Sequence, residues 1–222
     1  GWVMSSFGAG SVVGSWLGGK LADVLGFRPV MIGALIASGC AFIGLQYIRD
    51  LLPFCGGVFV LMVLSDAFRP AMFVAIRAYA KRAHRTRAVT LIRLAINLGF
   101  SMGPALGGFI IARGGFGGLF WVDAVTCLLA ALLLWATLPH TVVVEEVDTI
   151  TSNAARSPYR DRPYLFFLLI VSLTGIPFLQ YFSSVPLFYS QVHGLSEDMI
   201  GLILASNGLL IFLTEMPLVR YC

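Results

Sequence analysis

The chain has 222 residues, of which 58% are hydrophobic and 12% are charged, and its formal net charge is +4. A soluble domain carries roughly 25% charged residues, so these few charges could not cover the surface of one. The composition excludes a disordered chain and an ordinary soluble domain, and it favours a chain that crosses a membrane several times.

Seven apolar stretches, each long enough to span a bilayer as a helix, follow one another along the sequence. The stretches are continuously apolar and do not alternate, so helices are expected rather than the strands of a membrane barrel. The expected spans are about 1–18, 29–48, 54–79, 88–111, 118–138, 164–190 and 199–220. The breaks between them contain charges and turn residues, among them Gly18-Gly19-Lys20 and Arg113-Gly114-Gly115.

The distribution of basic residues predicts the orientation of the spans. The first, third and fifth breaks carry nine lysines and arginines, whereas the second, fourth and sixth carry two. Because basic loops are retained in the cytoplasm, the odd breaks are predicted to be cytoplasmic. The cluster from Lys81 to Arg87 is then a loop beside anionic lipid, and nucleic acid is not an expected partner.

A polar stretch over 139–163 separates the fifth span from the sixth. It carries charges of both signs and begins and ends with proline. Since it is too polar to span and too long for a tight turn, it is predicted to link two helical bundles. The expected domains are an N-terminal bundle over 1–138, a central cytoplasmic loop over 139–163 and the start of a C-terminal bundle over 164–222. Both ends of the chain lie in apolar runs, so we expect a fragment of a longer protein.

Ionisable residues inside the spans are the first candidates for a functional site, because a charge at the helix centre costs at least ~2.5–3.5 kcal/mol in hydrocarbon. Asp66 and Arg69 share one face of the third span, and Phe73 extends that face toward the cytoplasm. They indicate either a substrate or proton site in a wet cavity or an internal ion pair that only fixes packing. Glu215 in the last span is either a proton carrier or a carboxylate near the lipid headgroups.

The sixth span is rich in aromatic residues and is expected to be broken by Pro177 and Pro186. Its polar groups include Gln180, Tyr181 and Ser184. An aromatic stripe of this kind is either a substrate-binding wall or a packing surface, and the sequence leaves both open.

Two spans carry rows of glycine at every fourth position, which let helix backbones approach closely. The first span contains Gly10, Gly14 and Gly18, and the fourth contains Gly99, Gly103 and Gly107 with Pro104 and Gly108. Pro104 favours a kink, because it lacks a backbone donor.

The first cytoplasmic loop, GKLADVLGFRP from Gly19 to Pro29, resembles the G-x-L-a-D-r-x-G-r-k signature of the major facilitator superfamily. The matching residues are Gly19, Leu21, Asp23, Gly26 and Arg28. The fourth span is similar to the antiporter motif of the family, G-x8-G-x3-G-P-x2-G-G, through Gly99, Gly103, Pro104, Gly107 and Gly108. Thr90 stands where that motif begins with glycine, so the match is partial. By these two motifs the chain is identified as a member of the family.

This resemblance implies an all-α membrane protein with a major facilitator-type helical bundle, in which the second to eighth of twelve helices are present. It implies alternating access about a central cavity. The similarity to twelve-helix drug:proton antiporters implies proton-coupled efflux of small amphipathic compounds by a monomer in the bacterial inner membrane. No cofactor, no metal and no enzymatic activity are expected. The expected substrate and proton pathway comprises Asp66, Arg69, Phe73, Gln180, Tyr181, Ser184 and Glu215; the first loop would be a cytoplasmic gating motif and the glycines of the fourth span a bundle interface.

Two alternatives remain. A transporter of the same family could instead take up a sugar or another metabolite, and everted-vesicle flux distinguishes the two directions. A seven-helix receptor or photoreceptor has the right number of spans, but Lys20 and Lys81 both lie in loops, so no span offers an amine for a Schiff base. The three histidines also lie outside the spans, which speaks against a metal site or an intramembrane enzyme.

Overall fold

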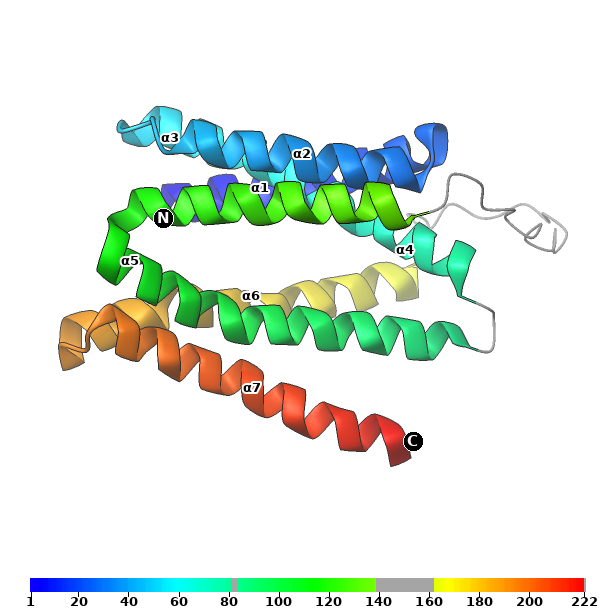
Figure 1. The fold of residues 1–222 in the computed structure, drawn as a ribbon. Coiled ribbons are helices and arrows are strands. Elements are labelled where there is room, and N and C mark those ends of the chain that lie inside the picture. The colour runs from blue at the N-terminus through cyan, green and yellow to red at the C-terminus, as the bar shows by residue number, and fades with distance from the viewer. Residues whose placement is uncertain (81–83, 139–161, 222) are drawn as a thin grey trace, which may run out of the picture.

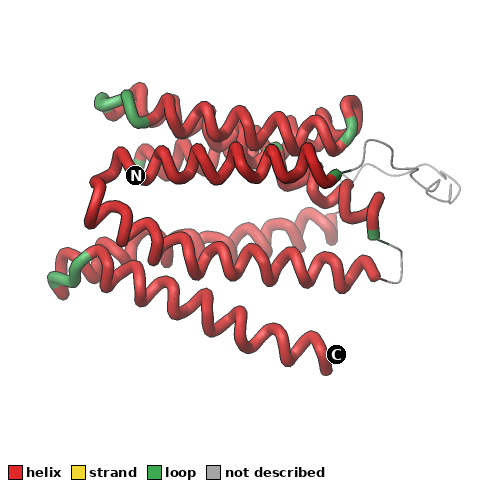
Figure 2. The backbone as a smooth tube through the Cα atoms, viewed as in Figure 1, coloured by secondary structure: helices red, strands yellow, loops and turns green. Residues whose placement is uncertain are grey.

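The computed structural model describes residues 1–80, 84–138 and 162–221, and within these ranges every regular element is an α-helix (Figure 1, Figure 2). The side chains at 112, 114, 176–183, 212 and 215–221 lie outside this description. The helices are α1 (Trp2–Leu25), α2 (Phe27–Leu45), α3 (Leu51–Asp66), α4 (Phe68–Tyr79), α5 (Arg85–Thr137), α6 (Arg162–His193) and α7 (Glu197–Tyr221). The predicted all-helical fold is confirmed.

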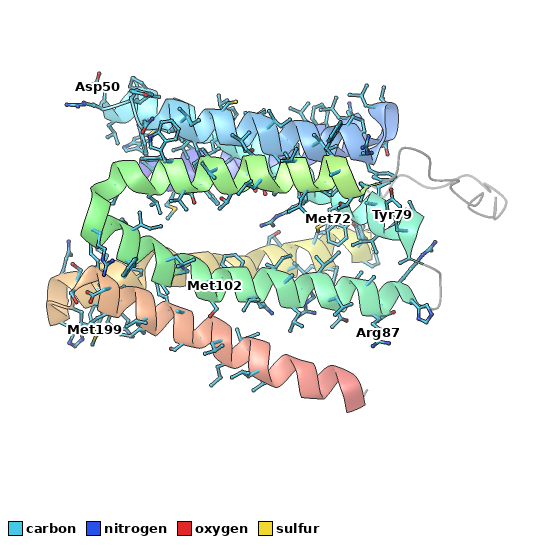
Figure 3. All side chains as sticks on the ribbon, in the orientation of Figure 1. Asp50, Met72, Tyr79, Arg87, Met102 and Met199 are labelled. Atoms are coloured by element: carbon cyan, nitrogen blue, oxygen red, sulfur yellow. The ribbon has the colours of Figure 1, made fainter. Side chains whose placement is uncertain are left out.

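Successive spans run in opposite directions when α3 and α4 are taken as one span and the two halves of α5 as two (Figure 1). The turns between the spans therefore gather at two ends of the molecule. Figure 3 shows Asp50 and Met199 at one end and Tyr79 and Arg87 at the other. The break after α2 and the break before α7, both poor in basic residues, therefore share an end, and the basic break after α4 lies opposite. This is the arrangement that the alternating charge of the breaks predicts.

The outer surface of the helices is apolar. Among the described residues, Phe27–Leu45, Leu51–Tyr79, Arg85–Ile111 and Gly115–Thr137 are long and apolar enough to cross a membrane. They overlap the second to fifth expected spans. Helices α1, α6 and α7 overlap the other three, but within the described residues they are not among those that meet this criterion. Large apolar side chains remain exposed on these helices; Leu133, for example, is 64% exposed. Such a surface is suited to lipid rather than to water.

Two glycines with positive φ make the sharp turns of the N-terminal half. Gly26, with φ 85°, separates α1 from α2, and Gly115, with φ 69°, turns α5 back on itself so that its two halves lie antiparallel (Figure 1). Residues with a Cβ atom rarely adopt a positive φ, so glycine is favoured at both positions. The first turn therefore lies at Gly26, and α1 continues as a helix through Gly19 and Lys20, where the sequence predicts a break.

Proline acts differently in two of the spans. The break expected in the sixth span at Pro177 and Pro186 is wrong, since α6 is one helix from Arg162 to His193. Membrane helices tolerate proline because local adjustments and neighbouring groups can satisfy the freed carbonyls. The third span is instead interrupted at Ala67, between α3 and α4. Pro70 explains the position, because its ring crowds the carbonyl of the residue four positions earlier, Asp66.

The core of the N-terminal half lies between α1, α2, α3, α4 and the second half of α5. One buried cluster consists of Ala22, Val30, Met31, Ala71 and Ala75, with Leu134 of α5 packed against it. A second consists of Leu45, Val58 and Leu61. The first half of α5 packs against α7, which follows the central stretch, so α5 joins the two parts of the fold. The domain boundaries at 138 and 164 stay a prediction.

Candidate functional site

The centre of the candidate site is a buried carboxylate at the junction of α3 and α4. Asp66 is the last residue of α3, and its side chain is 8% exposed. Arg69, in the first turn of α4, places its Nε 3.3 Å from Oδ1 of Asp66, so the ion pair predicted from the i, i+3 spacing is present. The guanidinium side chain is 68% exposed. The pair thus joins a buried anion to an accessible cation near the middle of a span.

A hydroxyl from a second helix completes the surroundings of Asp66. Ser11 of α1 donates a hydrogen bond from Oγ to Oδ2 of Asp66. Both carboxylate oxygens therefore have a partner, one ionic and one neutral. Sequence reasoning missed Ser11; the available signal was its position beside Gly10 in a row of small residues.

The glycine row of α1 brings Ser11 within reach of Asp66. A Cβ added at Gly10 would lie 2.5 Å from the carbonyl oxygen of Phe59, and one added at Gly14 would lie 2.5 Å from that of Val63. A Cβ added at Gly18 would likewise overlap the Cα and the carbonyl oxygen of Ala67. The predicted close approach of two backbones is present, and the partner of α1 is the α3–α4 rod.

One face of α4 is packed and the other is open. Ala71 and Ala75 are buried, and α4 contacts α1 and α2. The opposite face presents the exposed side chains of Arg69 and Arg77, with Phe73, 50% exposed, between them. A guanidinium near the middle of a span faces water or protein rather than lipid. Arg69 on this face is therefore expected to meet water or a further part of the protein, and the choice between a wet cavity and an ion pair that only fixes packing stays open.

The first-loop motif lies at the end of the bundle that carries the basic breaks. Gly19, Leu21 and Asp23 belong to the last turns of α1, where Leu21 and Asp23 are exposed, and a Cβ added at Gly19 would have nothing within 4 Å. Gly26 forms the turn into α2.

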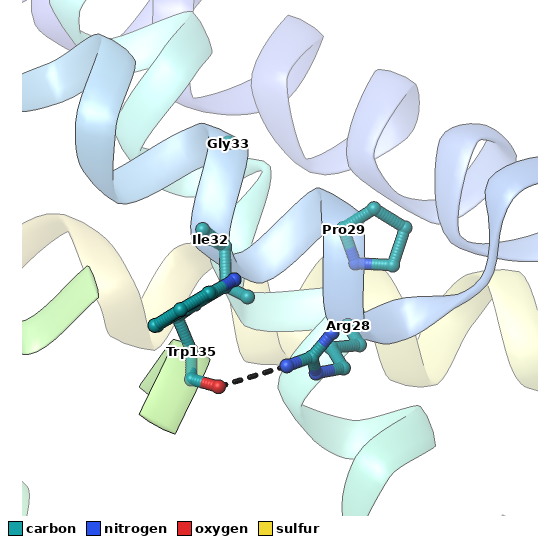
Figure 4. A pocket seen from close by; sticks show the side chains of 5 residues that line it. All are labelled: Arg28, Pro29, Ile32, Gly33 and Trp135. Carbon is teal, nitrogen blue, oxygen red and sulfur yellow. Dashed lines mark hydrogen bonds between the residues drawn. The ribbon is translucent and has the colours of Figure 1, made fainter. Parts of the chain in front are cut away.

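Arg28, the last residue of this motif, connects α2 to the end of α5. It donates from Nε to the carbonyl oxygen of Leu138, at 2.9 Å. It also donates from Nη2 to the carbonyl oxygen of Trp135, at 2.8 Å, and this second bond is drawn in Figure 4. Trp135 lies in the last turn of α5 and Leu138 is its C-cap residue. Because the last carbonyls of a helix have no intrahelical donor, Arg28 acts as a C-terminal cap of α5. A shallow pocket beside it is lined by Arg28, Pro29, Ile32, Gly33 and Trp135.

The glycine-rich motif of α5 meets α7 through only part of its residues. A Cβ at Gly99 or Gly103 would have nothing within 4 Å, and one at Gly107 would meet Leu119 at 3.7 Å. A Cβ at Gly108 would lie 3.3 Å from the carbonyl oxygen of Glu197 in α7.

The residues of α5 that face α7 are offset from the glycine row. A Cβ at Gly201 of α7 would lie 2.8 Å from the carbonyl oxygen of Pro104, and Gly208 packs on Ser101. Ser101 Oγ also donates to the carbonyl oxygen of Ala205, at 2.9 Å. Ser101 and the two glycines of α7 were not predicted from the sequence; the available signal was the seven-residue spacing of Gly201 and Gly208.

The remaining predicted site residues lie on α6 and α7. Ser184 is exposed on α6. The side chains of Gln180, Tyr181 and Glu215 lie outside the described part of the structure. Within the part that is described, no three histidine, cysteine, aspartate or glutamate side chains are placed to hold a metal ion.

The apolar helices, the close-packed glycine row of α1 and the charged groups within the spans define a multi-pass helical membrane protein. The sequence profile of the Major Facilitator Superfamily matches residues 1–221, so the chain belongs to this family of membrane transporters. The membership predicted from the two motifs is confirmed.

Two relatives come from Bacillus subtilis strain 168. The uncharacterized MFS-type transporter YfiS is 27% identical over 153 residues, which are 69% of this chain and 36% of that protein. The uncharacterized MFS-type transporter YwoD is 26% identical over 132 residues, which are 60% of this chain and 29% of that protein. The matched regions thus cover about a third of each relative. No solved structure matches the chain.

Proposed function

We propose that the full-length protein is a secondary transporter that exports small amphipathic compounds in exchange for protons by alternating access. The observation that carries the proposal is the carboxylate of Asp66, buried near the middle of a span and joined to the exposed guanidinium of Arg69. Ionisable side chains within membrane spans face the bundle interior or a water-filled cavity, where they mark proton and substrate pathways. The partial antiporter motif of α5 favours export over uptake.

Each group near Asp66 has a part in the proposed cycle. Asp66 is the proposed proton carrier, with Arg69 as its ionic partner and Ser11 as its hydrogen-bond donor. Phe73 offers an apolar surface to the substrate on the same face of α4. Gln180, Tyr181 and Ser184 of α6 are the proposed substrate contacts on the facing bundle, and Glu215 is a second candidate proton carrier.

The packing of α5 on α7 supports a mechanism in which two bundles move against each other. The contact relies on small residues, Ser101 and Gly108 on one helix and Gly201 and Gly208 on the other. Such a contact can separate and form again without rearranging large side chains. We infer that the protein works as a monomer in the bacterial cytoplasmic membrane, with Arg28 and the first loop at the cytoplasmic end.

Transport by everted membrane vesicles tests the proposal. Vesicles that contain the full-length protein are energised to an acidic interior and offered a panel of anionic, neutral and cationic amphipathic fluorescent dyes. We expect accumulation of at least one dye, abolished when nigericin collapses the pH gradient. Asp66→Asn should lower this accumulation at least about tenfold while the amount of inserted protein stays unchanged. Asp123→Asn, which alters a partly buried acid of α5, is the matched control.

Three outcomes contradict parts of the proposal. Normal accumulation by the Asp66→Asn variant would reduce this residue to a packing role. Accumulation only in right-side-out vesicles would establish uptake, the second candidate direction. Absence of gradient-driven movement in either orientation would defeat transport itself.

A further inference from the structure

We propose that the substrate of this transporter is an amphipathic anion, with a carboxylate, phosphate or sulfonate group and an apolar part, bound along the open face of α4. The inference rests on the transport function proposed above and adds the chemical class of the substrate.

The open face of α4 is cationic. Arg69 and Arg77 are separated by two helical turns on this face, and both side chains are exposed. Arg85, the first residue of α5, donates to the carbonyl oxygens of Arg77, at 3.2 Å, and Ala80, at 3.4 Å. A third guanidinium therefore lies at the basic end of the same helix. The positive charge extends from the middle of the span to the end predicted to be cytoplasmic.

The acid of this region is not accessible to a cationic solute. The described residues between 66 and 93 include five arginines and a single acidic residue, Asp66. Its side chain is 8% exposed, with Oδ1 paired to Arg69 and Oδ2 accepting from Ser11. A cation that reached this face would meet guanidinium groups before any carboxylate. An anion would be attracted, because charge of one sign along a low-dielectric passage concentrates the opposite charge.

The chemistry of the two arginines favours particular anions. A guanidinium is planar and matches the oxygens of a carboxylate or phosphate with two hydrogen bonds. The ion pair with Asp66 engages the Nε of Arg69, whose side chain is 68% exposed. Phe73 lies between the two arginines and is 50% exposed, so an aromatic or alkyl group attached to the anion has an apolar surface to contact.

Equilibrium binding to the full-length protein in nanodiscs tests the inference. The probes are dansylglycine, an anion at pH 7, and dansylcadaverine, a cation that carries the same fluorophore. We expect dansylglycine to bind at least about tenfold more tightly. Arg77→Gln should weaken dansylglycine binding at least about fivefold, and Arg69→Gln more than that, with Arg69→Lys between parent and Arg69→Gln. The control is Arg113→Gln, which removes an exposed arginine that lies over Phe109 of α5 and should leave binding unchanged.

The outcomes separate this inference from the proposed function. Equal or tighter binding of the cation, no binding of either probe, or unchanged anion binding in both Arg77→Gln and Arg69→Gln would overturn the inference. The ion pair of Asp66 is formed by Arg69, so Arg77→Gln leaves it intact. Dansylglycine binding by Arg77→Gln, measured on protein with parental circular dichroism, is therefore decisive if Arg69→Gln misfolds. Selective anion binding without gradient-driven transport supports the inference and defeats the transport proposal. Gradient-driven export of cationic dyes alone would support the transport proposal and overturn the inference of an anionic substrate.

Discussion

Gly208 of α7 lies directly against Ser101 of α5, since a Cβ added at Gly208 would come within 2.8 Å of both the Cα and the Cβ of Ser101. Ser101 also donates its hydroxyl to the carbonyl of Ala205, one turn earlier on α7. This contact joins the helix before the central stretch to the helix at the end of the chain. A side chain at position 208 should therefore separate the two helices.

The first prediction is that Gly208→Val pushes α7 away from α5, because the added methyl groups would overlap backbone atoms that cannot move aside. Overpacking of this kind typically costs about 1–3 kcal/mol. Disulfide formation between cysteines placed at Gly108 and Asp198, in a background without other cysteines, measures the distance between the helices. We expect clear cross-linking in the parent and several-fold less in the variant. Gly103→Val, where nothing lies within 4 Å, is the control, and equal cross-linking in all three would contradict the prediction.

Gly14→Val should destabilise the contact between α1 and the α3–α4 rod. The added Cβ would lie 2.5 Å from the carbonyl oxygen and 2.8 Å from the Cα of Val63, both backbone atoms. We expect a loss of at least about 1–3 kcal/mol in the free energy of unfolding, measured by SDS titration in mixed micelles. Gly19→Val changes a glycine of the same helix that has nothing within 4 Å and should cost little. A similar loss in both variants would show that the close approach at Gly14 is not the cause.

Gly26→Ala and Gly33→Ala should change stability in opposite directions. Gly26 has φ 85° and ψ 159°, a conformation that costs other residues about 1–3 kcal/mol. Gly33 lies inside α2 with open space around it, where alanine is a better helix former than glycine by about 0.5–1 kcal/mol. Unfolding in SDS of the two variants beside the parent measures both effects. If Gly26→Ala is as stable as the parent, the turn between α1 and α2 is not the one described.

Arg28→Ala should loosen the C-terminal end of α5. The substitution removes two hydrogen bonds from a charged donor to the carbonyls of Trp135 and Leu138, each worth about 1.5–3 kcal/mol when well buried and less at this partly exposed position. Hydrogen–deuterium exchange of the last turns of α5 should accelerate, whereas exchange in α7 should not change. Arg28→Lys keeps the favourable charge near the helix end but cannot reproduce both bonds, so intermediate exchange is expected. Parental exchange in Arg28→Ala would exclude the capping role.

Much of the fold followed from local sequence properties. Continuous apolar runs predicted the positions of the helices, because each membrane helix satisfies its own backbone hydrogen bonds and needs no information from its neighbours. The spacing of Asp66 and Arg69 predicted their ion pair, because the backbone stays in the helical region at Ala67 although α3 ends at Asp66. Local rules failed for Pro177 and Pro186, where α6 continues as one helix.

The sequence by itself determined the helices, their alternating directions, the family and the short-range pair at the centre of the site. Only the tertiary structure decided which helix meets which: that Ser11 of α1 reaches Asp66, that Arg28 caps α5, and that Ser101 rather than Gly103 faces α7. The physical reason is that helix pairing depends on the shapes of two surfaces at once. A row of small residues shows that a close neighbour is possible, but the identity of that neighbour lies elsewhere in the chain.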